Sequence, residues 1–209
     1  MVQVPAPPPP SQPFPVIYSL LPNQYFYRIF DPTKRNATAL TFRSYGPLQS
    51  GRFDHHRANL SKPSTDLERS IFYAGMTLEC CLVEVFGDIG TIEIAEQYLA
   101  CLGLQRDLHL LDLRSSTKAE NAGTVQELTV VVARELTQSW SRYFYEHPEI
   151  YSSIDGIIHI NRHNAEETVT LYERAIDGLK INWEMRLDDT RLRDAILFAA
   201  ARNNLTVVP

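Results

Sequence analysis

Five polar residues interrupt apolar stretches of this 209-residue chain, and their types suit the binding of an anionic ligand. Arg28 lies in an aromatic run, where an unpaired guanidinium would be costly, and Arg52 follows a glycine in a loop. Tyr73 lies at the end of a compact apolar run, Glu84 in a short helical segment, and Asn161 at the end of another apolar run. A guanidinium presents a planar fork that matches phosphate oxygens, so the two arginines are candidates for holding such a ligand.

Each of these residues also has an ordinary structural explanation. Arg28 could pair with a carboxylate across a sheet, and Arg52 could be a surface residue. Core packing with a satisfied hydroxyl explains Tyr73 equally well, an exposed helix position explains Glu84, and a turn explains Asn161. These residues alone define a candidate site without choosing a reaction.

Other familiar catalytic and metal-binding patterns are absent from the sequence. It has no glycine-rich phosphate loop, no nucleophile elbow and no zinc-protease helix. His159 and His163 are four residues apart, but the first lies in an expected strand, which does not suit helical metal geometry. His55 and His56 beside Asp54 are a better metal candidate, although loop histidines are usually just solvated. We therefore expect no bound metal.

Short strands and one short helix are expected to position the polar residues of the first half. Aromatic and apolar runs predict strands at residues 25–30, 39–43 and 71–75. Thr77 is a suitable N-cap for a helix over residues 78–86, and Gly87 is expected to close it. Glu84 then lies on the rim of the apolar face of this helix.

The second half continues the alternation of strands and helices. Strands are predicted at residues 91–94, 108–113, 157–161, 168–175 and 205–208. The capping box Thr124–Glu127 predicts a long amphipathic helix from Val125 to Tyr145, and a last helix is expected over residues 190–201. Because several strands are short and consecutive, the predicted fold class is α+β, a single mixed-sheet domain with flanking helices. A homodimer through the long helix is possible, although such a face usually packs in the core.

Composition limits the organisation and the partners of the chain. Eight of the 13 prolines lie within residues 1–22, which predicts an extended polyproline tail before a domain over residues 23–209. A net charge of −5 disfavours nucleic-acid binding by bulk attraction. No apolar run could span a membrane and no signal peptide is evident. Three irregularly spaced cysteines predict buried thiols, so we expect a cytoplasmic protein without disulfides.

The order of the polar residues resembles the RES domain family, which is named for its arginine, glutamate and serine and includes toxins of RES–Xre toxin–antitoxin systems. The resemblance covers about residues 25–175. Its pieces are Tyr27-Arg28-Ile29, Gly51-Arg52-Phe53, Phe72-Tyr73-Ala74, Glu84 eleven residues after Tyr73, and Gly156-Ile157-Ile158 ending at Asn161. The family usually has serine where this chain has Asn161, and an asparagine can still donate and accept hydrogen bonds.

The resemblance implies a fold like that of ADP-ribosyltransferases, no cofactor, and NAD as the substrate of an enzyme that releases nicotinamide. It implies that Glu84 stabilises the oxocarbenium-like state and that Tyr73 stacks on the nicotinamide ring. Arg28, Arg52 and Asn161 would hold phosphate, ribose or amide groups. It also implies a partner antitoxin with an Xre-type DNA-binding domain, whereas the chain itself would not bind DNA.

Three functional interpretations remain open from the sequence. In the leading interpretation the chain is an NAD-consuming toxin, whose acceptor is water, phosphate or a protein side chain. In the second it is a RES-like module that binds NAD or ADP-ribose without turning it over, and Asn161 indicates that the site has lost its catalytic activity. In the third it is an unrelated small hydrolase that uses Glu84 together with His55 or His56.

Overall fold

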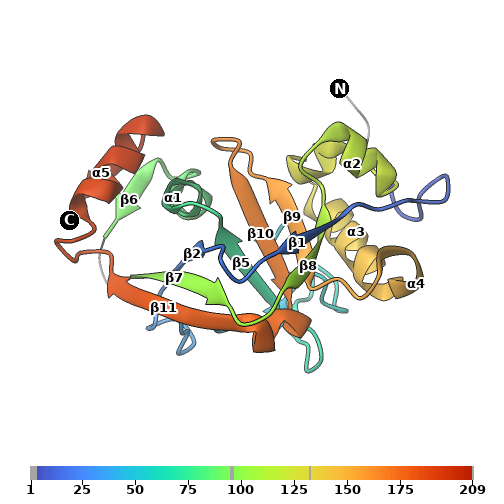
Figure 1. Ribbon diagram of the computed structural model, residues 1–209, viewed down its shortest axis with the longest axis horizontal. Coiled ribbons are helices and arrows are strands. Elements are labelled where there is room, and N and C mark those ends of the chain that lie inside the picture. The colour runs from blue at the N-terminus through green and yellow to red at the C-terminus, as the bar shows by residue number, and fades with distance from the viewer. Residues whose placement is uncertain (1–3, 95–96, 132, 209) are drawn as a thin grey trace.

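An eight-stranded mixed sheet forms the centre of the computed structural model, which describes residues 4–94, 97–131 and 133–208 (Figure 1). Across the sheet the strands are β1 (Ile17–Leu20), β8 (Leu108–Asp112), β9 (Gly156–Ile160), β10 (Glu167–Tyr172), β5 (Ile71–Gly75), β2 (Phe26–Phe30), β7 (Tyr98–Leu104) and β11 (Leu179–Arg186). Among these described strands β8 and β9 pair in parallel, and the other neighbours are antiparallel.

Two short ribbons accompany the sheet. One joins β6 (Thr91–Glu93) with β12 (Thr206–Val208), and the other joins β3 (Tyr45–Gly46) with β4 (Ser64–Thr65). The helical elements are α1 (Leu78–Phe86), α2 (Ser116–Asn121), a 3-10 turn (Gln126–Thr129), α3 (Arg134–Glu146), α4 (Pro148–Tyr151), a second 3-10 segment (Glu173–Gly178) and α5 (Arg193–Arg202).

The helices form two groups on the curled sheet (Figure 1). On one side α1 and α5 pack together through Leu82, Phe86 and Ile196. On the other side Trp140 and Phe144 of α3 pack in the core formed with α2, α4 and strands β8 and β9. The architecture confirms the α+β mixed-sheet class expected from the sequence, and it leaves the central strands β2, β5 and β10 between the two groups of helices.

Several local predictions are confirmed. The strands over β2, β5, β6, β8, β9, β10 and β12 and the helices α1 and α5 are present, each within a few residues of its predicted bounds. The Thr77 hydroxyl caps α1 by accepting a hydrogen bond from the amide of Cys80 at 3.0 Å. Gly87 follows the last residue of α1 but keeps right-handed backbone angles. The left-handed conformation that favours glycine occurs at Gly90, with φ of 75°.

The predicted long helix from Val125 to Tyr145 is wrong. A 3-10 turn ends at Thr129, and α3 begins only at Arg134; Val132, within the expected helix, lies outside the described residues. The capping box does not form, because the buried Thr124 hydroxyl has no hydrogen-bond partner among the described residues. β-branched residues crowd this stretch, which lowers its helix propensity. The apolar face of α3 packs in the protein's own core.

Strand assignments failed where pairing depends on distant partners. Residues 39–43 were expected to be a strand, but only Arg43 makes an isolated bridge, to Ile71. Strands β7 and β11 were not predicted, although they pair with each other along one edge of the sheet. Within the part of the chain that the structure describes, no helix combines the length and apolar character needed to cross a bilayer.

The proline-rich N-terminal segment, which we expected to form an extended tail, lies against the domain. The indole of the fully buried Trp140 donates a hydrogen bond to the carbonyl of Pro5 at 2.7 Å, and the Phe14 amide donates to Asn121 at 2.8 Å. Pro9 packs so closely on Gly123 that a Cβ there would lie 2.5 Å from it. Residues 17–20, which the expected tail included, form the edge strand β1. We call residues 4–16 the N-terminal strap.

Removing the strap should destabilise the fold. A chain that begins at residue 11 lacks the acceptor for the buried Trp140 indole, and leaving such a donor unpaired costs about 1–3 kcal/mol. We therefore expect the free energy of unfolding, measured by urea denaturation, to fall by this amount. The Pro5→Ala variant is the matched control, because it keeps the carbonyl and should change stability little. Equal stability of the truncated and full-length chains would show that the strap does not support α3.

Candidate functional site

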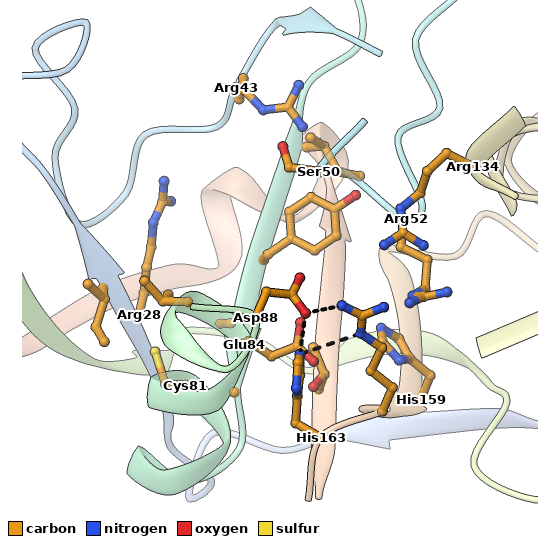
Figure 2. Close-up of a pocket in the computed structure, with 18 residues that line it drawn as sticks. Arg28, Arg43, Ser50, Arg52, Cys81, Glu84, Asp88, Arg134, His159 and His163 are labelled. Carbon is orange, nitrogen blue, oxygen red and sulfur yellow. Dashed lines mark hydrogen bonds and ion pairs between the residues drawn. The ribbon is translucent and has the colours of Figure 1, made fainter. Parts of the chain in front are cut away.

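A pocket of about 320 Å³ opens over the central strands, between α1, α3 and the loop that leads to Phe53 (Figure 2). It is lined by four of the five residues singled out from the sequence. Arg28 comes from β2, Arg52 from the loop, Tyr73 from β5 and Glu84 from α1. The fold therefore brings together residues that are spread over almost 60 positions of the sequence, and it places them in one concave site.

Asn161, the fifth residue, is not among the residues that line the pocket. Its buried amide nitrogen donates to the Cys80 thiol at 3.1 Å and to the Asn164 side chain at 2.6 Å. Its side-chain oxygen accepts from the backbone amides of His163 and Asn164 at 2.8 and 2.9 Å. Asn161 thus fixes the turn after β9, and this turn carries Arg162 and His163 into the pocket.

The buried carboxylate of Asp54 organises the loop side of the pocket. It accepts two hydrogen bonds from Arg43, at 2.7 and 2.8 Å, one from the Leu48 amide at 2.8 Å and one from the Tyr73 hydroxyl at 2.7 Å. The Tyr73 hydroxyl in turn accepts from the Phe53 amide at 3.0 Å. These contacts fix the Tyr73 ring, and burial next to Asp54 raises the pKa of its hydroxyl well above the usual value.

Gly51 is required by this arrangement. A Cβ at this position would lie 2.1 Å from a carboxylate oxygen of Asp54 and 2.3 Å from its Cγ. Only a residue without a side chain lets the loop approach the carboxylate so closely. The Gly51-Arg52-Phe53 sequence therefore places Arg52 at the pocket by packing the loop against Asp54.

Arg28 is held without a carboxylate partner among the described residues. Its guanidinium donates to the Thr41 carbonyl at 2.7 Å and lies over the Phe72 ring, 4.1 Å from the centroid. Burial lowers its pKa to about 10, so the group stays charged at neutral pH. The structure therefore does not support the explanation that Arg28 pairs with a carboxylate across the sheet.

Glu84 points into the pocket and forms no hydrogen bond or ion pair within the described part of the chain (Figure 2). Its side chain is exposed, as expected for a position on the helix surface, although the protein around its carboxyl group desolvates it in part. The partial desolvation raises its pKa above the ordinary value, while Arg52 and Arg162 act in the opposite direction. An unpaired carboxylate among cations is available to a positively charged group of a ligand.

The pocket is strongly cationic although the whole chain carries a net charge of −5. Its lining contains five arginines (Arg28, Arg43, Arg52, Arg134 and Arg162) and two carboxylates (Glu84 and Asp88). Arg162 forms an ion pair with Asp88, which also lies 3.8 Å from His163 (Figure 2). The excess of guanidinium groups makes the pocket suitable for an anionic ligand.

His55 and His56, the histidines considered as partners of Glu84 or as metal ligands, lie away from the pocket lining. His159 lines the floor of the pocket, where burial lowers its pKa to about 4 and keeps it neutral. His55 and His56 are fully buried and bond to Glu173 and to the Arg43 carbonyl, and neither lines the pocket. Among residues 4–94, 97–131 and 133–208, no three histidine, cysteine, aspartate or glutamate side chains gather in a group that could hold a metal ion.

Sequence reasoning missed several pocket residues. Arg43 belonged to a segment assigned as a strand, and Asp88 follows α1 without any motif. Arg134 lies at the start of a helix whose beginning was misplaced, so it was expected mid-helix. Arg162 could have been found from its position next to Asn161 at the end of an apolar strand, where side chains of a sheet protein commonly reach a site.

Fold and pocket together define a class of protein: an α+β domain with one large mixed sheet and an arginine-rich pocket around an unpaired glutamate. Within this class the comparison with protein families is specific, because the model of the RES domain matches residues 25–190. The chain belongs to the RES domain family. The matched region contains every residue of the pocket, whereas the strap, β1 and α5 lie outside it.

A solved structure has the same fold. A chain of the crystal structure of the M. tuberculosis MbcT–MbcA toxin–antitoxin complex superposes with a TM-score of 0.54 at 14% sequence identity. The match covers 86% of this chain and 90% of that one. No sequence among curated proteins matches the chain significantly.

Gly51→Ala should damage both stability and the site. The added methyl group would overlap the buried Asp54 carboxylate, and relief of such an overlap typically costs about 1–3 kcal/mol of unfolding free energy. Denaturation curves should show this loss, whereas Ser50→Ala, at the exposed neighbouring position, should stay within about 0.5 kcal/mol of the wild type. A Gly51→Ala protein of wild-type stability would mean that the loop moves away from Asp54 at no cost.

Proposed function

We propose that the chain is an NAD-consuming toxin of a toxin–antitoxin system, which cleaves the bond between nicotinamide and ribose. The observation that carries this proposal is the Glu84 carboxylate, which has no partner in the described structure and lies in a pocket with five arginines. NAD carries both a negatively charged diphosphate and a positively charged nicotinamide ring. Its binding site therefore needs cationic groups for the diphosphate and an anionic group near the ring. Membership of the RES domain family supports the same substrate.

Glu84 acts on the charge that develops as the bond breaks. The electron pair of the ribose–nitrogen bond moves to the nicotinamide ring, which leaves as a neutral base, and the ribose becomes oxocarbenium-like. An ionised carboxylate beside the ribose stabilises this positive charge and accepts a hydrogen bond from a ribose hydroxyl. The leaving group needs no proton, so the pocket requires no general acid.

The other residues bind and orient the substrate. The ring of Tyr73, fixed through Asp54, offers a flat face for the nicotinamide and excludes water from it. Arg28 and Arg52 hold phosphate or ribose oxygens through their guanidinium forks. Asn161 does not line the pocket and serves as a positioning residue, because its side chain fixes the turn that carries Arg162 and His163.

A second protein is proposed to control the activity. The structural neighbour comes from a complex whose title names a toxin and an antitoxin, and the family resemblance implies an Xre-type antitoxin. We infer that such a partner covers the pocket and excludes NAD from it. The acceptor of the ADP-ribosyl group is water, inorganic phosphate or a protein side chain, and the dependence of nicotinamide release on phosphate distinguishes phosphate from the other two.

Nicotinamide release from NAD should depend on Glu84. We expect Glu84→Gln to lower kcat by about 10²–10³-fold, because it removes the charge that faces the oxocarbenium-like ribose. The measurement is nicotinamide release by purified protein with and without inorganic phosphate. Faster release with phosphate would identify phosphorolysis. Expression of the wild type, but not of Glu84→Gln, should lower cellular NAD and inhibit growth.

Glu79→Gln is the matched control, since Glu79 lies on the same helix and does not line the pocket. It should keep the wild-type rate. If neither the wild type nor any variant released nicotinamide, yet NAD raised the melting temperature, the chain would be a binding module and not an enzyme. Full turnover by Glu84→Gln would remove Glu84 from the reaction.

The activity should decline in acid at a pH above the ordinary glutamate pKa of 4.5, because Glu84 must be ionised and burial raises its pKa. Activity is therefore present above this raised pKa and is lost as pH falls through it. Arg162→Gln should move the acid limb of the kcat–pH profile to higher pH, since a cation is removed. Asp88→Asn should move it to lower pH. Shifts in the same direction for both variants would show that Glu84 does not set this limb.

A further inference from the structure

Two arginines of the pocket, Arg52 and Arg134, donate hydrogen bonds to the same backbone carbonyl although they are far apart in the sequence. Arg52 donates to the Val131 oxygen at 2.5 Å, and Arg134 donates to the same oxygen at 3.2 Å. The Nε of Arg134 also donates to the Gln49 carbonyl at 3.0 Å, which ties α3 to the loop that carries Arg52. The two guanidinium groups therefore lie together at the α3 side of the pocket (Figure 2).

Neither guanidinium has a carboxylate partner among the described residues, although many arginines of this protein have one. Arg106 and Arg114, for example, bind Asp155 and Asp112 directly at 3.0 and 2.6 Å. Burial and the charge of Arg134 lower the pKa of Arg52 to about 10, and burial and the charge of Arg162 lower the pKa of Arg134. Burying two adjacent cations without a counter-ion costs free energy. The hydrogen bonds that Arg52 and Arg134 donate within the described residues go only to carbonyl oxygens.

Most of the N–H donors of the pair remain available to a ligand. Each guanidinium has five such donors, and the carbonyl contacts use one from Arg52 and two from Arg134. These contacts also hold both side chains in place before a ligand arrives, which reduces the entropy lost on binding. Two preorganised forks side by side match a group with several anionic oxygens.

We propose that Arg52 and Arg134 form a clamp for the diphosphate of the substrate, an inference that rests on the function proposed above. Arg28 lies on the opposite side of Glu84 (Figure 2), so it contacts another part of the ligand. The diphosphate then lies toward α3, and the ribose that reacts lies next to Glu84. Arg134, the first residue of α3, then binds the substrate, although it belongs to none of the motifs found in the sequence.

Binding of inorganic pyrophosphate and of ADP, measured by isothermal titration calorimetry, tests the clamp without requiring catalysis. Arg134→Gln should raise the Kd of both by about 10–100-fold, the usual effect of losing charge-assisted hydrogen bonds. The Kd of adenosine, which lacks phosphate, should not change. Arg134→Lys keeps the charge but not the fork, so its Kd should be intermediate. Arg142→Gln, on the same helix outside the pocket, should bind like the wild type.

The outcomes separate the clamp from the proposed function. Pyrophosphate binding that depends on Arg134, together with absence of NAD cleavage by the wild type, would keep the clamp and reject the reaction. NAD cleavage with an unchanged KM in Arg134→Gln would reject the clamp and keep the reaction. Absence of pyrophosphate binding at millimolar concentration by the wild type would also overturn the clamp. If Arg134→Gln does not fold, as its melting temperature without ligand would show, Arg134→Lys decides: wild-type affinity overturns the clamp.

Discussion

The buried Asp54 carboxylate is the interaction on which the rest of the site depends. Its four hydrogen bonds join Arg43, Leu48 and Tyr73, so they connect the loop before Phe53 to the central strand β5. A buried carboxylate must be fully compensated, and removing one partner would leave the others unpaired in a low-dielectric environment. The need to satisfy one charge therefore fixes the position of a loop, a tyrosine ring and the glycine that precedes Arg52.

The arginines of the pocket fall into two groups according to their partners. Arg43 and Arg162 are neutralised by Asp54 and Asp88, and they shape the pocket wall. Arg28, Arg52 and Arg134 bind only carbonyl oxygens or an aromatic ring among the described residues. Three guanidinium groups without a carboxylate partner among the described residues therefore line the same pocket as the unpaired Glu84.

Local signals in the sequence were sufficient for the elements that carry most site residues. The aromatic run around Arg28, the apolar run ending at Gly75 and the Thr77 cap predicted β2, β5 and α1, and four of five candidate residues meet in the pocket. Asn161 was assigned to the ligand through the resemblance to the family, whereas its side chain bonds to the distant Cys80 and to the backbone of the turn that follows it. The turn explanation considered from the sequence therefore agrees with these hydrogen bonds. The interrupted helix before Arg134 and the pairing of β7 with β11 also depend on tertiary contacts, which override local propensity.

The order of the strands has a consequence for synthesis of the protein. β5 pairs with β10, and β2 pairs with β5 and with β7, so neighbours in the sheet are separated by long stretches of sequence. Such pairings form slowly, because chain entropy must be lost before the contacts compensate for it. A nascent chain that has not reached Tyr172 lacks β10, and with it the wall of the cavity that Thr168 provides. The lining of the pocket, which runs from Arg28 to Thr168, is therefore complete only after most of the polypeptide has been made.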